Sequence, residues 1–485
     1  MATAMMVMPL ASCSKWLDII PEDTTVEKNL FSDAAGYYSA VNGIYQTLAT
    51  DNLYGKNLSW GFASALSQDY DNYSINNSKA FSRTENYEYG SDEVKAYGEQ
   101  IWQNGYNVVA NANNVLKHIE TVDEDFFPNI KFDDASLIKG EMLAVRALVQ
   151  FDLLRLFAPS PKENASAKAI PYVKEYPSFF NERLTVGDVL ANVEKDLIDA
   201  KDLLAEADTL KGLYEFESVS NLFQSTNTAG LFFSARGSRL NYFAVTALLA
   251  RVYAYAGDLD NAYKYATEFK SWCSNDKCGY KYTEGWTDSD TPESRPHKLI
   301  DEIVIGFYRE TLAVDYESVT SGTDGSTNSF ALKGLGEIFS DSDDVRRLKL
   351  VYDNSLDVHV SLKYKTRKET GSRTIVVENR LVPVLRLPEI NLIIAEYLVQ
   401  NGRSDEAAEL VNELRSARRC ASNKVDASTV ADAIGKEFRR ESIAEGQYFF
   451  FCKRTGAAQI NAGGVYIDMA GKYTMNIPDS EITLN

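Results

Sequence analysis

Two segments rich in aromatic rings and planar polar side chains are the strongest candidates for ligand recognition. Flat rings stack on the apolar face of a ligand, while carboxylate and amide groups hydrogen-bond its polar substituents. Neither segment has a helical or strand period, which predicts loops, where binding residues concentrate. Ordinary packing is the alternative for each residue singly, and we expect at least two to contact a ligand. The candidates are Trp60, Asp69, Tyr70, Asp71, Asn72 and Tyr73 in the first segment, and Tyr280, Tyr282 and Trp286 in the second.

No catalytic signature accompanies these residues. The sequence has no G-x-S-x-G, H-E-x-x-H or G-x-x-x-x-G-K-[ST] motif, and the G-x-G at Gly334–Gly336 lacks its third glycine. A chain with 3 His is poorly equipped for several imidazole ligands or acid–base groups. The enzyme alternative is a surface glycoside hydrolase, which needs two carboxyl groups roughly 5–10 Å apart. With 69 acidic residues the sequence leaves that pair open, but we expect no enzyme, no cofactor and no metal site.

The charge of the chain excludes some classes of partner. Lys and Arg number 50 and Asp and Glu number 69, so the net charge is −19. Non-specific nucleic-acid binding needs a basic face, and adsorption to anionic lipid needs a polybasic patch. The 28 Tyr, 23 Phe and 5 Trp suit recognition surfaces as well as a core. This composition disfavours both of those functions and favours binding over catalysis.

The first residues are typical of an export signal. The apolar, uncharged MATAMMVMPLAS is followed at once by Cys13, and Leu10-Ala11-Ser12-Cys13 is similar to a bacterial lipobox. We expect residues 1–12 to be a signal peptide, truncated because the positive n-region is missing, and Cys13 to be the lipidated residue. Acyl chains on that thiol would anchor the protein without a spanning helix. The alternative is a frayed terminus with a chance cysteine.

The other cysteines fit an exported chain. Cys273 and Cys278 have four residues between them in a polar loop and are candidates for a local disulfide. A zinc site would need two further ligands at matched spacing, and no Cys or His pair supplies them. We expect Cys420 and Cys452 to be buried single thiols.

The elements that must position the candidate loops are mainly helices. Helical periodicity follows Ser32-Asp33 and recurs at 98–120, 135–157 and 186–206. Two helix–turn–helix units of tetratricopeptide-like pattern span 239–270 and 387–418, and Gly257 and Gly402 lie where their first helices must end. The units are some 145 residues apart, which argues against a tandem solenoid. Residues 51–97 are expected to be a long loop, and 271–385 to be loop-rich with β-like runs at 302–308, 357–364 and 373–379.

An ordered series of short motifs resembles the SusD/RagB family of outer-membrane nutrient-binding lipoproteins of Bacteroidetes. Each motif is weak singly, but together they cover nearly the whole chain. They are Cys13-x-x-Trp16-Leu17-Asp18-x-x-Pro21, Phe31, Tyr37, Val41-x-Gly43-x-Tyr45, Trp102, Tyr106, Asn111, Asn113, Gly140-Glu141, Arg146-Ala147, Phe151-Asp152-Leu153-x-Arg155-x-Phe157, Ile170-Pro171, Asp196-Leu197-x-x-Ala200, Leu385-Arg386-x-x-Glu389, Ala395-Glu396, Asn412-x-x-Arg415, Arg439-Arg440-Glu441-x-x-x-Glu445-Gly446 and Asn476-Ile477-Pro478-x-Ser480-Glu481-Ile482. The sequence departs from the pattern after Gly446, where Tyr448, Phe451 and Cys452 stand in place of the usual Arg and Asp-Leu.

The resemblance implies a mostly α, SusD-like fold with four tetratricopeptide-like helix pairs, long irregular ligand-facing loops and minor β structure. It implies a lipid-anchored protein of the outer-membrane surface that captures an oligosaccharide and delivers it to a SusC-like TonB-dependent transporter. A peptide-binding, RagB-like uptake lipoprotein is the alternative within the family. The regions we expect are 1–12 (signal), 13–32 (lead-in), 33–238 and 239–485, the last two forming one compact unit.

Several other polar and aromatic residues are expected to be structural. Trp102 falls in a helical pattern and should pack in the core. The acidic run Asp341–Asp344 lacks the spaced ligands and glycine of an EF-hand, so a solvated charge run is expected there in place of a Ca²⁺ site. Structural ion pairs are expected at Arg146, Arg155, Glu396, Arg439 and Glu441.

Overall fold

The computed structural model describes thirteen stretches of the chain, and every structural statement below concerns these residues. They are 27–71, 79–123, 125–128, 133–211, 213–223, 230–274, 277–283, 291, 294–320, 330–353, 358–369, 371–420 and 424–484.

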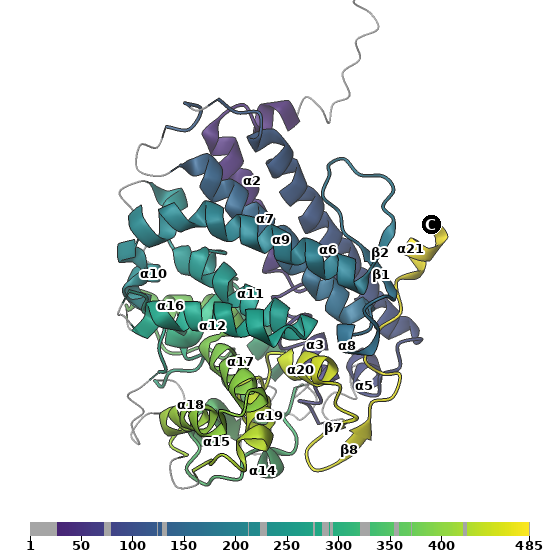
Figure 1. Ribbon diagram of the computed structural model, residues 1–485, viewed down its shortest axis with the longest axis vertical. Coiled ribbons are helices and arrows are strands. Elements are labelled where there is room, and N and C mark those ends of the chain that lie inside the picture. Colours follow the sequence, from purple (N-terminus) through teal and green to yellow (C-terminus); the bar gives the residue numbers. More distant parts are fainter. Residues whose placement is uncertain are drawn as a thin grey trace, which may run out of the picture.

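Helices make up most of the described residues (Figure 1). They are α2 (Ala34–Leu48), α3 (Phe62–Leu66), α5 (Lys79–Glu85), α6 (Asp92–Ile119), α7 (Asp134–Phe157), α8 (Pro161–Asn164), α9 (Val186–Ala205), α10 (Val219–Leu222), α11 (Tyr242–Ala256), α12 (Leu259–Ser274), α13 (Leu312–Thr320), α14 (Leu335–Ile338), α15 (Val345–Leu350), α16 (Arg373–Arg380), α17 (Leu387–Gln400), α18 (Ser404–Ala417), α19 (Val430–Glu441), α20 (Gln447–Thr455) and α21 (Asp479–Leu484). The strands are β1 (Lys168–Pro171), β2 (Arg183–Thr185), β3 (Ile303–Tyr308), β4 (Val351–Asp353), β5 (His359–Ser361), β6 (Leu381–Arg386), β7 (Gln459–Asn461) and β8 (Tyr466–Asp468).

The helix boundaries follow local capping chemistry. Asp33 accepts a hydrogen bond from the Gly36 amide at 2.9 Å and begins α2, and Thr185 caps α9 by accepting from the Asp188 amide. Gly257 ends α11 in the left-handed region at φ 85°, and Gly402 follows α17 at φ 71°. Both glycines adopt a conformation that costs other residues free energy, which is why the helix must end there.

The long helices pack as one continuous row. Each helix in the row contacts the next one, in the order α6, α7, α9, α11, α12, α17, α18 and α19 (Figure 1). The two helix pairs that lie far apart in sequence therefore meet directly, α12 against α17. The rings of Tyr263 and Tyr397 stack across this contact with centroids 4.0 Å apart. The two units are not in tandem along the chain, yet they lie side by side in the fold.

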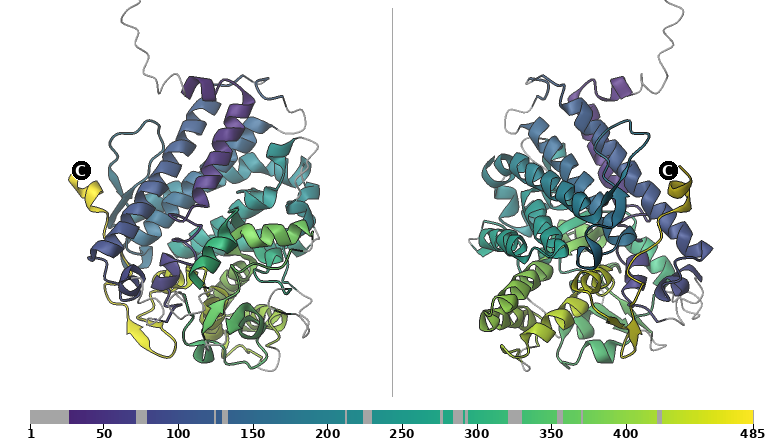
Figure 2. Two further views of the ribbon diagram at one scale, coloured as in Figure 1. Left: turned by 180° about the vertical axis from the view of Figure 1, so that it is seen from behind. Right: turned by 45° about the vertical axis from the view of Figure 1, so that its right-hand side comes forward.

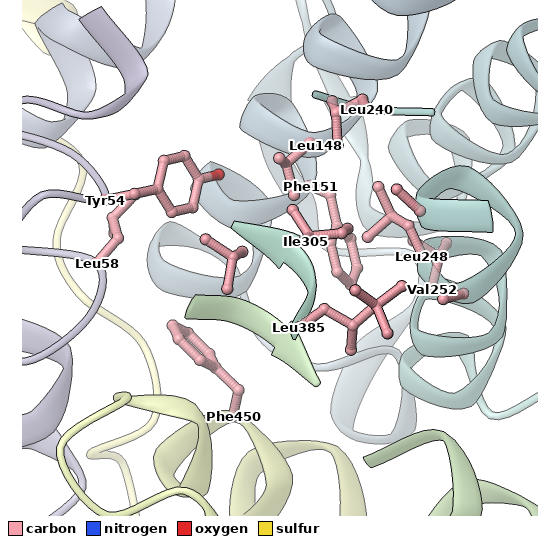
Figure 3. Packing of buried hydrophobic residues seen from close by; sticks show 14 of the residues in the cluster. Tyr54, Leu58, Leu148, Phe151, Leu240, Leu248, Val252, Ile305, Leu385 and Phe450 are labelled. Carbon is pink, nitrogen blue, oxygen red and sulfur yellow. The ribbon is translucent and has the colours of Figure 1, made fainter. Parts of the chain in front are cut away.

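The strands form small antiparallel ribbons that pair β1 with β2, β3 with β6, β4 with β5, and β7 with β8. The β3–β6 ribbon lies at the centre of the core (Figure 3). Ile305 and Leu385 on the ribbon face Phe151 of α7 and Val252 of α11, while Tyr54 approaches from the other side. This burial joins the N-terminal helices to the C-terminal ones, and Figure 2 shows α2 (purple) and α18 (yellow-green) at opposite ends of the molecule.

Some expected elements differ from the observed ones. The run 373–379, expected as β-like because of its β-branched residues, is helix α16, and the adjacent residues 381–386 form the strand instead. Residues 51–97, expected as a long loop with at most short structured pieces, contain the short helices α3 and α5, but α6 begins at Asp92 and so earlier than the expected residue 98. Asp341 and Asp344 are buried rather than solvated, since Asp344 caps α15 and pairs with Arg346, and Asp341 pairs with Arg415.

The residues expected to form ion pairs do so inside the molecule. Arg439 pairs with Asp69. The other pairs are Arg146–Asp196, Arg155–Asp152, Arg454–Glu396 and Arg418–Glu441. Trp102 is buried, as expected.

Candidate functional site

Trp60 and Tyr70 lie in the core rather than on a ligand-facing surface. Trp60 is 1% exposed, and its indole nitrogen donates to the Gly55 carbonyl at 2.8 Å. Tyr70 is fully buried and its hydroxyl donates to the Trp60 carbonyl. The ring of Phe330 meets both rings edge-on, at 5.3 and 5.0 Å between centroids. These rings have no free face for a ligand in this structure, and they anchor the segment that leads to Asn72 and Tyr73.

Asp69 also has a structural role, because both of its carboxylate oxygens bind other parts of the protein. One carboxylate oxygen pairs with Arg439 and the other accepts from the Ala444 amide at 2.9 Å. The neighbouring Gln68 carbonyl accepts from the same guanidinium at 2.9 Å. The carboxylate is therefore fully engaged inside the protein. Asn72, Tyr73 and Trp286 lie outside the described residues, so their role as ligand contacts stays a prediction.

Tyr280 and Tyr282 are buried in the second candidate segment. The Tyr282 hydroxyl accepts from the Asn391 side chain at 2.5 Å, and burial raises the pKa of both phenols well above the usual value. The backbone of this segment is held by Asp301, whose carbonyl accepts from the Lys281 amide at 3.1 Å. Both rings are packed inside the protein, in the segment that precedes Trp286 in the sequence. Neither ring offers an exposed face to a ligand.

The thiols of Cys273 and Cys278 lie beside this segment, with their sulfur atoms 2.7 Å apart. The contact with Cys278, together with burial, raises the pKa of the Cys273 thiol. Their disulfide stays a prediction. Cys420 and Cys452 are both buried, as expected.

Three segments that are distant in sequence converge at one place, which we call the loop corner: residues 69–71, 330–333 and 358–361. The Asp71 amide donates to the Ala331 carbonyl at 2.7 Å, and the Lys333 amide donates to the Asp69 carbonyl at 3.1 Å. The Leu332 amide donates to the His359 carbonyl at 2.7 Å. The expected ligand residues Asn72 and Tyr73 follow directly in sequence on one of these segments, so the corner fixes the position of the chain up to Asp71.

A buried carboxylate with a shifted pKa, that of Glu85 on α5, contacts Lys333 of the loop corner. Burial raises the pKa of Glu85 to about 7, against the opposing effect of the Lys333 ammonium that pairs with it. Lys333 also donates to the Gln68 side chain at 3.0 Å, and the second oxygen of Glu85 is buried without a hydrogen-bond partner. Glu85 is buried, so this carboxyl group is enclosed beside the loop corner and offers no surface to a ligand.

An exposed aromatic ring that sequence reasoning missed lies next to the loop corner. The β7–β8 hairpin packs its Gly463 turn against the backbone of Gly334, and it carries Tyr466 with 62% of its surface exposed. Asn461 lies opposite Tyr466 in the hairpin register. The signal in the sequence was the Gly463-Gly464 turn followed by Val465-Tyr466, which reads as a hairpin with an outward ring.

The charged interior next to α19 is structural. A cavity of about 20 Å³ is lined by Arg251, Arg386, Glu389, Glu441 and Glu445. A space of this size holds roughly one water molecule and no sugar ring. Arg386 donates to Glu445 at 2.8 Å and Arg418 donates to Glu302 at 2.6 Å, so these charges satisfy one another. Among the described residues, no group of three or more His, Cys, Asp or Glu side chains is placed to hold a metal ion.

Comparison with known families gives two matches. Residues 15–219 match a family described as SusD-like, starch-binding and associating with the outer membrane, and residues 352–480 match the SusD family of the SusD/RagB type. The chain belongs to the SusD/RagB family. Among curated proteins no relative matches it.

Solved structures of similar fold come from Bacteroides. A SusD superfamily protein of Bacteroides thetaiotaomicron has 22% identity and a TM-score of 0.69, covering 93% of this chain and 98% of its own. A SusD superfamily protein of Bacteroides vulgatus has 20% identity and a TM-score of 0.68, covering 93% and 97%. A SusD-like carbohydrate binding protein of the same species has 17% identity and a TM-score of 0.67, covering 93% and 96%. The predicted mostly α, SusD-like fold is confirmed.

A search of the described helices for a membrane span finds none that combines the necessary length with the necessary apolar character.

Proposed function

We propose that this protein is a glycan-binding lipoprotein of the cell surface, anchored in the outer membrane through Cys13. In this proposal it captures an oligosaccharide and delivers it to a SusC-like TonB-dependent transporter without breaking a bond. The observation that carries the proposal is membership of the SusD/RagB family, with family matches over residues 15–219 and 352–480. The starch-binding description of the first family and the carbohydrate binding protein among the similar structures support a sugar as the ligand.

We place the glycan site at the loop corner. Tyr466 supplies an exposed ring next to it, and Asn72 and Tyr73 follow Asp71 of the corner directly in the sequence. Trp286 is proposed as a further platform, because it follows the buried Tyr280 and Tyr282 closely in the sequence. Rings and planar polar groups in this combination match the needs of a pyranose, which has apolar faces and equatorial hydroxyls.

Calorimetry against a panel of oligosaccharides and peptides tests the proposal. We expect at least one oligosaccharide to bind, and Tyr73→Ala and Tyr466→Ala each to weaken it by about 30-fold, the effect of losing ~2 kcal/mol at a contact that dominates binding. Tyr308→Ala is the matched control, because that ring is 41% exposed at the end of β3 and its hydroxyl donates to Glu310.

The other outcomes separate the alternatives. Binding of peptides with no response to any glycan would favour the RagB-like function. Release of reducing ends from a glycan by the purified protein would favour a glycoside hydrolase. Glycan binding that is unchanged by both Tyr variants would leave the family assignment intact and remove the site from the loop corner.

A further inference from the structure

Two adjacent phenylalanines project from the loop between β1 and β2. Phe179 has 94% of its surface exposed and Phe180 has 72%, which makes them a concentrated apolar surface on a strongly charged protein. Single exposed apolar residues are ordinary on protein surfaces, but two neighbouring phenylalanines at a tip mark an interaction site.

The base of this loop is rigid. The Asn113 side chain donates to the Val173 carbonyl at 3.1 Å, and the side-chain oxygen Oε1 of Gln150 accepts from the Val173 amide at 2.6 Å. On the return side Arg183 donates to the Ala169 carbonyl at 2.8 Å. Hydrogen bonds to α6 and α7 therefore fix the base of the loop, and the fold places the two rings in solvent.

The loop lies beside the point where the N-terminal segment leaves the folded body. Glu27 contacts the His118 ring at 2.7 Å and the Lys117 ammonium at 3.8 Å. The same ammonium lies over the Tyr176 ring, 5.7 Å from its centroid, three residues before Phe179. One lysine side chain thus links the two features, and Figure 1 shows the loop rising towards the end of the molecule where α2 begins.

We propose that Phe179 and Phe180 insert into the lipid surface to which the N-terminal segment is tethered. The inference rests on the proposed lipid anchor at Cys13. If Cys13 is lipidated, the chain that joins it to Glu27 attaches the protein to the membrane at a point next to this loop, which keeps the two rings near the bilayer. Insertion of an apolar tip at the boundary between headgroups and acyl chains is worth roughly ten- to a hundredfold in partitioning per ring. With the anchor, the two contacts fix the orientation of the protein on the membrane.

A lipid fits this tip better than a protein partner. A stable protein interface needs about 800 Å² from each partner, whereas two phenylalanines supply roughly 300–400 Å². The nearby charges also balance, since Lys168 pairs with Glu182 at 3.1 Å, so attraction would come from the rings rather than from a basic patch.

Bromine quenching of introduced tryptophans tests the insertion. The full chain, with a hexahistidine tag before Met1, is bound to phosphatidylcholine vesicles that contain a nickel-chelating lipid, with or without dibrominated phosphatidylcholine. We expect the added fluorescence of Phe179→Trp and Phe180→Trp to fall at least twofold with brominated lipid. Leu348→Trp is the control, because it is 51% exposed on α15, which Figure 1 shows at the end of the molecule away from the loop.

The tag takes the place of the acyl chains, so the result does not depend on lipidation of Cys13 or on glycan binding. Equal quenching at Leu348→Trp, or none at either loop position, would overturn the proposal. A fluorescence change in the loop variants that requires the transporter in detergent, without lipid quenching, would assign the tip to a protein interface instead. As a second measurement, the double variant Phe179→Ser/Phe180→Ser should partition onto plain phosphatidylcholine vesicles at least tenfold less than the unsubstituted chain.

Discussion

Arg439 on α19 forms a buried ion pair with Asp69, which lies 370 residues earlier in the chain. The pair connects the C-terminal helices to the start of the loop that carries Asn72 and Tyr73. The Asp69 carboxylate also accepts from the Ala444 amide and the guanidinium also donates to the Gln68 carbonyl, so each partner makes a second buried contact. The family motif that contains Arg439 thus positions the loop corner.

Removing the carboxylate should destabilise the protein strongly. Asp69→Asn leaves the Arg439 guanidinium buried without its counter-charge, and breaking such a pair costs about 3–5 kcal/mol. The free energy of unfolding from urea titration measures this. Asp199→Asn, which removes an exposed partner of Lys195 on α9, is the control and should leave the urea midpoint unchanged. Equal midpoints for both variants would show that the buried pair contributes nothing.

Glu85 should make stability depend on pH. Its pKa is raised from 4.5 to about 7 in the folded protein, so between these values the folded state binds more protons than the unfolded chain. The contribution of Glu85 to stability is therefore fully present below pH 4.5 and is lost as pH rises through 7, by about 3 kcal/mol in total at ~1.4 kcal/mol per pKa unit.

The measurement is the free energy of unfolding from pH 4.5 to 8, for the unsubstituted chain and for Glu85→Gln. As pH rises, the free energy of unfolding of the unsubstituted chain should fall relative to that of Glu85→Gln. Glu88→Gln, which removes an exposed carboxylate three residues further on, should follow the unsubstituted chain. Parallel curves for Glu85→Gln would mean that Glu85 titrates normally.

The α12–α17 contact should carry measurable coupling. Tyr263 and Tyr397 stack at an interplanar angle of 19°, and aromatic pairs contribute about 0.5–1.5 kcal/mol beyond their burial. A double-mutant cycle of Tyr263→Leu and Tyr397→Leu, measured by urea unfolding, should give a coupling free energy in this range. Strict additivity would show that the helix pairs associate without this stack.

Helix pairs were predictable because their signals are local. The small-residue pattern and the terminal Gly257 and Gly402 determine where each pair begins and turns. Their stacking was not predictable from spacing, because α12 and α17 meet only after the intervening 271–385 has folded back through the β3–β6 ribbon.

The positions of the loop aromatics depended on contacts that sequence does not display. Trp60 and Tyr70 lie in a stretch without periodicity, so the sequence left both ligand contact and ordinary packing open for each ring. Their burial comes from distant partners, namely Phe330, Tyr316 and Tyr364. A similar non-local effect acts on α16, whose β-branched residues favour strand, but whose helical form lets the Glu378 carboxylate accept from the His297 amide at 2.6 Å.

Cys273 and Cys278 should form a disulfide in the exported protein, whereas Cys420 and Cys452 should stay reduced. The first two sulfur atoms are already in contact at the end of α12, and the other two are buried apart. Alkylation of unfolded protein without reductant, followed by mass spectrometry of its peptides, should label only Cys420 and Cys452. Labelling of all four would show that the pair stays reduced.

Lipidation of Cys13 should attach the protein to the membrane without affecting its affinity for a glycan. Cys13→Ala, expressed in a host that processes lipoproteins, should move the protein from the membrane fraction to the soluble fraction, because the thiol that receives the acyl chains is gone. Glycan affinity should be unchanged, since the loop corner lies in the folded body far along the chain from residue 13. Ser14→Ala is the matched control and should stay in the membrane fraction, as judged by immunoblotting of separated fractions. Membrane retention of Cys13→Ala would instead assign attachment to other features, of which the exposed Phe179 and Phe180 are the first to remove.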